Sequence, residues 1–188
     1  MGEKICILLA QSKKSNADFL SSALKKSGYD NIFCVFDGID AVRMFEKLSP
    51  NVVFIDSALP LLDGISVLKK IKNADRDCIA AITSAEYSKA IADEFIKNGS
   101  DGFITEPFSE DRIIPWLIVS LAEKERSRKL KEEYISMSEI FNGRLDFERV
   151  VGKFASENSL SFEEAKKQLC SISESKNIPL EKLIEILK

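Results

Sequence analysis

The stretch Val52-Val53-Phe54-Ile55-Asp56-Ser57-Ala58-Leu59-Pro60-Leu61-Leu62-Asp63-Gly64 decides the fold of this chain. Its first four residues are apolar, which is typical of a strand buried on both faces inside a parallel sheet. Asp56 closes this strand, and Pro60 with the Asp63-Gly64 pair predicts a turn before a helix begins. Ligands of open α/β sheets bind at the carboxyl ends of the strands, so Asp56 is a candidate site residue. The alternative is that Asp56 merely ends a strand.

Short apolar runs alternate with helical patterns from Lys4 to Pro107. The runs predict strands at 5–9, 32–36, 52–55, 79–82 and 103–104. Between the runs, apolar residues recur at the spacing of one helical face. Repeated strand–helix units predict an α/β fold, a doubly wound parallel sheet of five strands with helices on both sides.

Composition limits the classes of function. The chain has 188 residues, 45% of them hydrophobic, which is enough for one large or two small cores. No apolar run approaches the roughly 18 residues of a membrane helix, so we expect a cytoplasmic protein with no membrane contact. The chain has no histidine, and its four cysteines lack metal-ligand spacing. We therefore expect neither an enzyme nor a metal centre.

Three motifs carry a resemblance to a known family. They are Asp56-x-x-Leu59-Pro60-x-x-Asp63-Gly64, the run Ile-Ala-Ala-Ile-Thr-Ser at 79–84, and Gly-Ser-Asp-Gly-Phe-Ile-Thr-Glu-Pro-Phe at 99–108. In order and spacing they resemble the receiver domain of bacterial response regulators, the proteins of two-component signal transduction. The resemblance implies a flavodoxin-like receiver fold at residues 1–121.

The resemblance also assigns roles to residues of the expected pocket. It implies that Asp56 stands at the phosphoacceptor position and that the hydroxyl of Thr83 binds phosphoryl oxygens. Phe103 is then the aromatic residue that reports the switch, and Pro107 follows a cis peptide bond. A regulatory protein partner would dock near Phe103 and Trp116.

Two chemical parts of the family pattern are replaced. Where the family has its acidic pair, we assign Ala10-Gln11, and where it has a lysine, this chain has Glu106. Magnesium is held through carboxylates and water, so its binding should be weak or absent and no cofactor is expected. The carboxylates of Asp56 and Glu106 would also repel each other, by up to ~4 kcal/mol at a separation of about 4 Å. We therefore predict a degenerate pseudo-receiver that works without phosphorylation; the alternative is an atypical phosphorylated regulator that uses Asp56.

A helical linker is predicted at 122–143. The charged run from Glu123 to Glu133 contains neither Gly nor Pro, which indicates an exposed helix. An apolar stripe follows at heptad-like spacing: Leu130, Tyr134, Met137 and Phe141. It favours a homodimer through a coiled coil, with packing on the C-terminal domain as the alternative. The pair Asn142-Gly143 is predicted to stop the helix.

Residues 144–188 form three helical patterns and resemble the ANTAR domain of AmiR/NasR-type regulators. The resemblance rests on Ser161-x-x-Glu164-Ala165, on Leu169, and on Leu180-x-x-Leu183-Ile184. It implies binding of structured leader hairpins in RNA and control of transcription antitermination. The motif lysine of the family is replaced by Val151, and an Ala-Met pair by 173–174.

Charge gives the RNA hypothesis local support only. Beyond Leu121 the chain carries 13 basic and 13 acidic residues, so this half is neutral. Most nucleic-acid binders present a basic face. The candidate RNA-binding residues are Arg144, Arg149, Lys153, Lys166 and Lys167. The rival hypothesis is a protein-interaction adaptor that binds no RNA.

Overall fold

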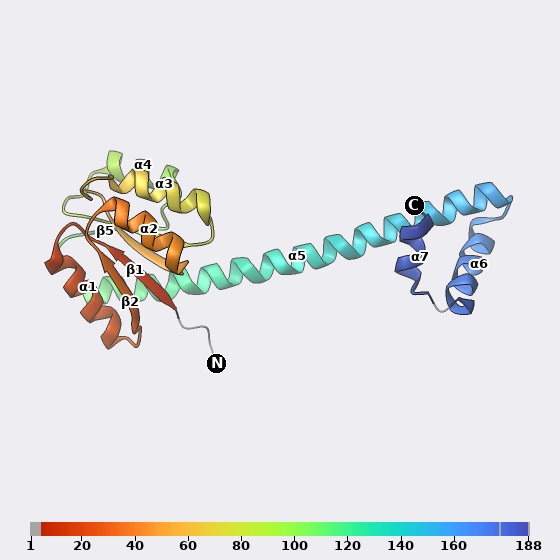
Figure 1. Ribbon diagram of the computed structural model, residues 1–188, viewed down its shortest axis with the longest axis horizontal. Helices are drawn as coiled ribbons and strands as arrows, with labels where there is room; N and C mark the ends of the chain where they lie inside the picture. Colours follow the sequence, from red (N-terminus) through yellow and green to blue (C-terminus); the bar gives the residue numbers. More distant parts are fainter. Residues whose placement is uncertain (1–4, 177, 188) are drawn as a thin grey trace. The chain divides into compact units, whose positions relative to one another are not determined.

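The computed structural model describes residues 5–176 and 178–187, without the side chains at 136, 138–143 and 181. Contacts divide the chain into two compact units, Met1–Arg126 and Ser127–Lys188. Figure 1 shows the first unit as a sheet wrapped by helices and the second as helices alone. Each unit is described by itself below.

The first unit confirms the predicted fold. Its strands are parallel and lie in the order β2-β1-β3-β4-β5. Their bounds are β1 (Cys6–Ala10), β2 (Asn31–Val35), β3 (Val52–Asp56), β4 (Ile79–Ser84) and β5 (Gly102–Thr105). All five residues of β3 are buried, as expected for a central strand covered on both faces.

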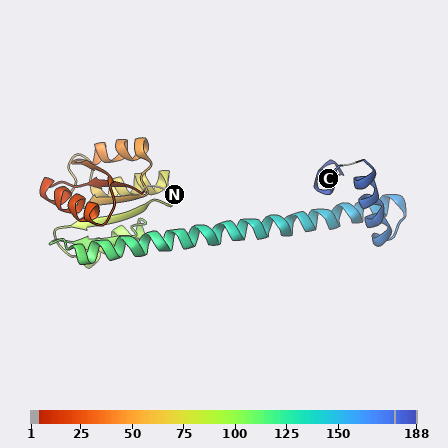
Figure 2. The same cartoon turned by 90° about the horizontal axis from the view of Figure 1, so that it is seen from below.

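Helices cover both faces of this sheet, as Figures 1 and 2 show. They are α1 (Lys14–Lys26), α2 (Gly38–Leu48), α3 (Gly64–Ala74), α4 (Lys89–Lys97) and the first turns of α5 (Glu110–Asn158). One core cluster joins the sheet to α2, α3 and α4, through residues such as Phe45, Leu68 and Phe95. The other joins it to α1 and α5, through residues such as Leu20 and Leu117. This arrangement leaves the carboxyl ends of the strands uncovered by a helix layer.

Two glycines hold the loop after β3 in place. The amide of Gly38 donates to the carbonyl of Pro60 at 3.0 Å, and a Cβ at Gly38 would stand 2.0 Å from the Leu62 carbonyl oxygen. A Cβ at Gly64 would stand 2.5 Å from the carbonyl oxygen of Asp56. Any larger residue would push the loop away, because real Cβ atoms do not approach so closely. The loop that carries Asp56 is therefore packed tightly against α2 and α3.

The helix α5 does not stop at Asn142-Gly143, so that prediction is wrong. It runs for 49 residues to Asn158, where Ser159 takes a left-handed φ of 57°. A glycine inside a helix costs only about 1 kcal/mol relative to alanine. Each further residue adds a hydrogen bond, and Val150 and Val151 anchor the following turns in a core. The free-energy gain from these later turns therefore exceeds the cost of placing Gly143 inside the helix.

The second unit has a hydrophobic core of its own. It joins the end of α5 to α6 (Phe162–Ser175) and α7 (Leu180–Leu187). The buried members are Val150, Val151, Ala155, Ala165, Leu169 and Leu183. The predicted capping box at the start of α6 is present, with Ser161 and Glu164 bonded in both directions. Leu145, five residues before Val150 on α5, is 49% exposed.

The apolar stripe of α5 is open to solvent. Leu130, Tyr134 and Met137 are 59%, 74% and 70% exposed. These three residues therefore do not pack on the C-terminal helices. The fourth member, Phe141, lies outside the side chains that the structure describes.

Candidate functional site

Asp56 ends β3 at the carboxyl edge of the sheet and is 6% exposed. Both of its oxygens accept hydrogen bonds. The amide of Ser12 donates to Oδ2 at 3.1 Å, the Ser12 hydroxyl makes a short bond to the same oxygen, and the amide of Ala58 donates to Oδ1 at 2.9 Å. The chain itself therefore surrounds this buried carboxylate with donors, as its burial requires.

Gln11 and Thr83 form a closed pair beside Asp56. The Gln11 amide nitrogen donates to Thr83 Oγ1 at 3.0 Å, and the Thr83 hydroxyl donates to Gln11 Oε1 at 3.1 Å. Gln11 is 0% and Thr83 1% exposed. The register brings them together, since Thr83 pairs with Asp56 across β3 and β4 while Gln11 directly follows β1. The hydroxyl of Thr83 is thus engaged inside the protein.

Glu106 is held by cationic and polar groups at the start of α1. Lys13 Nζ lies 3.4 Å from its carboxylate, and Asn16 Nδ2 donates to Oε1 at 2.8 Å. The peptide bond between Glu106 and Pro107 is cis, as the resemblance implied. These partners offset the negative charge of Glu106 and connect the loop after β5 to the start of α1.

Ser12, which the sequence analysis did not name, bonds Asp56 beside Gln11. Ala10 lies in the core cluster that includes α2 and α3, whereas Gln11 and Ser12 supply the two side chains that bond Thr83 and Asp56. Sequence reasoning did not single out Ser12, because the family pattern draws attention to the pair Ala10-Gln11 alone. The signal was available: β1 ends at Ala10, and side chains beyond a strand's end point into the site.

The loop that begins at Asp56 ends at Asp63, the N-cap of α3. Asp63 accepts from the Ser66 amide at 2.9 Å and from the Ser66 hydroxyl at 2.8 Å. These hydrogen bonds lower the pKa of the exposed Asp63 carboxyl below its usual value of 3.8. Asp63 therefore acts as a charged, exposed cap of α3.

The donor set at this edge does not fit magnesium, the ion that the resemblance implied. Both oxygens of Asp56 and the amide of Gln11 are already bonded within the chain. The neighbouring side chains of Gln11 and Ser12 are neutral, whereas Mg²⁺ is held chiefly through carboxylates and water. Among residues 5–176 and 178–187, no three His, Cys, Asp or Glu side chains gather as a metal-ion site.

Phe103 lies half-buried between two other aromatic rings. Its centroid is 6.4 Å from that of Tyr87, edge-on, and 6.3 Å from that of Phe95. Trp116 packs edge-on against Phe54 at 5.6 Å, and a Cβ at Gly102 would stand 2.5 Å from its Nε1. Tyr87 is 71% exposed, so this aromatic group reaches the surface.

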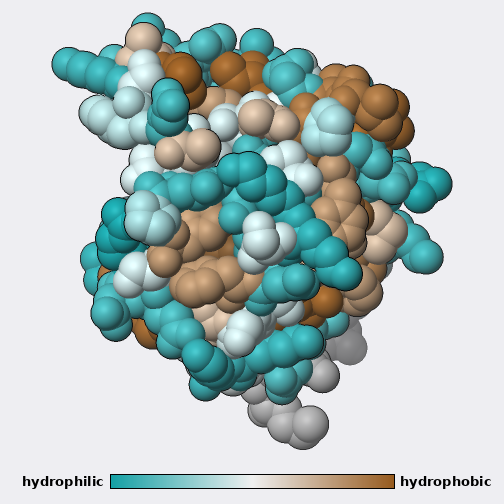
Figure 3. Space-filling view, turned by 90° about the vertical axis from the view of Figure 1, so that its left-hand side faces the viewer, coloured by the Kyte–Doolittle hydropathy of each residue, from teal (hydrophilic) through white to brown (hydrophobic). Residues whose placement is uncertain are grey.

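Figure 3 shows the end of the molecule that lies at the left of Figure 1. Hydrophilic side chains cover much of this face, and apolar ones appear between them as separate patches. Within residues 5–126 of the receiver unit, the exposed large apolar residues are Phe19, Phe36, Ile39, Leu61, Tyr87, Ile91, Ile96, Ile118 and Val119. They belong to several loops and helices, so a partner could meet apolar side chains on more than one face.

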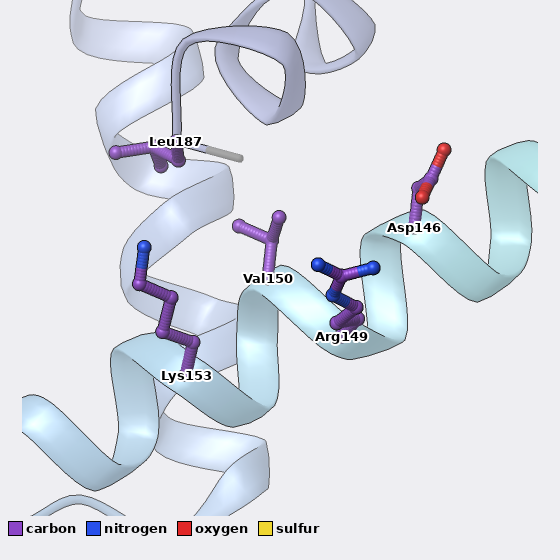
Figure 4. A pocket seen from close by; sticks show the side chains of 5 residues that line it. All are labelled: Asp146, Arg149, Val150, Lys153 and Leu187. Carbon is purple, nitrogen blue, oxygen red and sulfur yellow. The ribbon is translucent and has the colours of Figure 1, made fainter.

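In the second unit, two of the candidate RNA-binding residues line one pocket. Arg149 and Lys153 lie there with Asp146 and Val150 of α5 and Leu187 of α7, around a volume of about 210 Å³. Figure 4 shows the four side chains of α5 pointing to the same side, with Leu187 near Val150 and Lys153. Positions 146, 149, 150 and 153 share one helical face because they are three, four and seven residues apart.

The other candidates stand apart from this pocket lining. Arg144 pairs with Glu148 at 3.4 Å, four residues along α5. Lys166 and Lys167 are exposed on α6, beside the buried Ala165. Among the aromatic residues of this unit, Phe147 and Phe154 pack against the core, while Phe162 is 43% exposed.

Comparison with known proteins identifies the first unit. Residues 7–117 match the family model described as "Response regulator receiver domain". The receiver domain of Francisella response regulator 1452 is 32% identical over 65% of this chain and 98% of that chain, with a TM-score of 0.57. A signal receiver domain from Vibrio parahaemolyticus is 27% identical over 68% of this chain and 97% of that chain, with a TM-score of 0.63.

A longer protein also matches in this region. NtrX from Brucella abortus is 25% identical over 67% of this chain, but over only 28% of that chain, with a TM-score of 0.64. Because the family model spans more than half of its residues, this chain belongs to the response regulator receiver family. It is therefore a signal-transduction regulator. Receiver domains interact with regulatory protein partners and are generally not enzymes.

None of the helices in the described part of the chain is long and apolar enough to cross a membrane.

Proposed function

We propose that this receiver domain regulates without magnesium-dependent phosphorylation of Asp56. The observation that carries the proposal is the reciprocal pair of hydrogen bonds between Gln11 and Thr83, at 3.0 and 3.1 Å. It engages the hydroxyl that would bind phosphoryl oxygens. Ser12 occupies one oxygen of Asp56, and Glu106 contributes a negative charge in place of a positive one. Control would come from a regulatory protein partner.

Phosphorylation chemistry tests this proposal directly. The full chain is incubated with magnesium and either acetyl phosphate or beryllofluoride, then examined by intact mass and chemical-shift mapping. We expect no added phosphoryl mass and no stoichiometric beryllofluoride complex. Clear modification of Asp56 would overturn the proposal and favour the atypical phosphorylated regulator.

A variant that restores charge makes the negative result informative. Changing Gln11→Glu, Ser12→Asp and Glu106→Lys supplies two carboxylates and one cation around Asp56. Carboxylates favour Mg²⁺, which supports phosphoryl transfer by neutralising developing charge. If this variant gains phosphorylation while the wild-type chain does not, the substituted residues are the cause.

We also propose that the second unit binds structured leader RNA and so controls transcription antitermination. Support comes from its compact three-helix core and from Arg149 and Lys153, two exposed cations one helical turn apart. Cations that contact phosphates release counterions from RNA, so affinity should fall as salt rises. Asp146 beside them lowers the net charge of the face, which favours specific contacts over broad attraction.

Binding of hairpin RNA by the full chain tests the output proposal. The double variant Arg149→Ala with Lys153→Ala should weaken binding and reduce the salt slope by roughly one per lost phosphate contact. The control Arg43→Ala with Lys97→Ala removes the same charge from exposed positions of the receiver unit. Equal losses in both variants would indicate non-specific attraction and contradict the proposal.

The adaptor remains a second candidate, favoured by the neutral composition beyond Leu121 and by the open stripe of α5. Leu130, Tyr134 and Met137 would form a coiled-coil homodimer if they met their counterparts in a second chain. Sedimentation of the wild-type chain and of Leu130→Glu tests this. A dimer lost in the variant, with no RNA binding in either, would favour the adaptor over the RNA-binding regulator.

A further inference from the structure

The pocket between α5 and α7 combines apolar walls, one carboxylate and two cations. Val150, 5% exposed, and the half-buried Leu187 supply the apolar part. Asp146 lies at one end of the α5 row, and Arg149 and Lys153 follow three and seven residues later (Figure 4). A surface that only attracted phosphates would need neither an apolar wall nor a carboxylate.

The size of the pocket limits its ligand. Its volume of about 210 Å³ is smaller than the ~300–1,000 Å³ of sites for drug-sized molecules. One planar ring system fits this space, with its face against Val150 and Leu187 and its edge toward the charged groups.

The charged groups select among ring systems of this kind. A carboxylate only accepts hydrogen bonds, and it accepts best from two parallel N–H donors. Among RNA bases, guanine presents two neighbouring donors, N1–H and the N2 amine, beside the acceptor O6. Arg149 or Lys153 can donate to O6 while Asp146 accepts from the other two. Adenine, cytosine and uracil each place an acceptor where guanine has one of these donors.

We infer that this pocket binds one unpaired guanine of an RNA, with Asp146 reading its Watson–Crick edge. The inference rests on the RNA-binding function proposed above. Unpaired bases are the usual targets of sequence-specific RNA recognition because their edges and faces are accessible. Asp146 takes part in an interaction within the chain, yet a carboxylate has about four lone-pair sites and can accept further bonds.

The first test uses mononucleotides as probes and the full chain with ¹³C-labelled methyl groups. Titration with GMP should shift the methyl signals of Val150 and Leu187 at lower concentration than AMP, CMP or UMP. Inosine monophosphate, which lacks the N2 amine, should bind more weakly than GMP. Equal shifts with all nucleotides, or with inorganic phosphate alone, would overturn the inference.

The variant Asp146→Asn keeps the size of the side chain and replaces one acceptor oxygen with a donor. It should lose the preference for GMP over AMP and retain the signal changes that phosphate causes near Lys153. The comparison of GMP with inosine monophosphate uses the wild-type chain, so it stays decisive even if the variant is unstable. An unchanged preference in a folded Asp146→Asn chain would contradict the role of Asp146.

Hairpins with a randomised loop separate this inference from the proposed function. Selection on the full chain should enrich one unpaired guanine, with discrimination of roughly fivefold to a hundredfold for a good bidentate contact. Salt-dependent hairpin binding without base preference would contradict guanine recognition by the pocket but would support the proposed RNA-binding function. Binding of GMP without any hairpin binding would do the reverse.

Discussion

Polar side chains are buried and bonded to one another at the carboxyl edge of the receiver sheet, whereas on the α7-facing side of α5 they are exposed. Gln11, Asp56 and Thr83 are at least nine-tenths buried. Arg149 and Lys153 reach into solvent around a pocket. Groups of the first kind stabilise the fold, because their hydrogen bonds are made within the protein. Groups of the second kind add little to stability and can contact a ligand.

The largest effect on stability should come from breaking the buried pair. Thr83→Val removes the hydroxyl and leaves the buried Gln11 amide without that partner, which costs about 1–3 kcal/mol of unfolding free energy. Gln11→Leu should cost a similar amount. The double variant should lose less than the sum, since no buried amide is then left unsatisfied. Urea unfolding of all three chains measures the coupling.

A matched control for this cycle is Thr105→Val on β5. Thr105 also lies near the carboxyl edge but is only half-buried, so water can replace its bonds. Its loss of stability should be well below that of Thr83→Val. Additive costs for Gln11→Leu and Thr83→Val would show that the two side chains act independently and would contradict the closed pair.

A smaller effect is expected at the exposed start of α6. Ser161→Ala removes an N-cap that accepts from the Glu164 amide at 3.3 Å, and should cost about 1 kcal/mol. Urea unfolding and amide exchange at 162–164 measure it. Ser171→Ala, in the exposed middle of the same helix, should instead stabilise slightly, because alanine has the higher helix propensity. Loss of stability in both variants would point to general disturbance of α6.

A pH-dependent effect should appear at Asp63. Its carboxyl has a lowered pKa because Ser66 donates to it, so its stabilising charge is fully present above about pH 4 and is lost as pH falls through the lower folded value. Asp63→Asn keeps a good N-cap but removes the charge. The difference in unfolding free energy between the two chains should be a few tenths to about 1 kcal/mol at neutral pH and low salt.

The same difference should shrink below pH 4 and in high salt, since the group is exposed and screened. Urea unfolding at neutral and acidic pH, each at two salt concentrations, measures it. A difference that grows as the pH falls would contradict the sign of the shift. The hydrogen bonds of the exposed Asp63 should therefore contribute less to the free energy of unfolding than those of the buried Thr83, because water competes for them.

Much of the fold could be predicted because its signals are local. Runs of apolar residues such as 52–55 predicted all five strands, and the motif around Asp56 placed that residue at the end of β3. The apolar periods of α6 and α7 predicted their buried faces. Each of these inferences needs only residues within one element and its flanking turn.

The features that the sequence did not predict depend on contacts between residues far apart in the chain, or on the cooperative stability of a long helix. Gln11 and Thr83 are 72 positions apart, and only the order of the strands brings them together. The hydrogen bond from Ser12 to Asp56 could not be predicted, because these residues are 44 positions apart and meet only through the pairing of β1 with β3. The stop at Asn142-Gly143 failed because a local cost of about 1 kcal/mol is small beside a continuing helix.

The smallest effect is expected at Arg144, a candidate RNA-binding residue of α5 that does not line the pocket. Its guanidinium pairs with Glu148 at 3.4 Å, with 79% and 51% of the two side chains exposed. Exposed pairs at this spacing contribute about 0.3–0.5 kcal/mol, so Arg144→Ala should barely change unfolding by urea. Its effect on RNA affinity should also be smaller than that of Arg149→Ala, because Glu148 already answers part of its charge.

RNA affinity measured over a range of salt concentrations shows which of the two single variants, Arg144→Ala or Arg149→Ala, loses more binding. Both remove one positive charge from α5 within five positions of each other, so each serves as the other's control for net charge. A larger loss for Arg149→Ala would locate the RNA contacts at the pocket, where cations stand beside apolar walls. A larger loss for Arg144→Ala would place the RNA contacts elsewhere on α5, outside the pocket. That result would contradict the role proposed for the pocket in RNA binding.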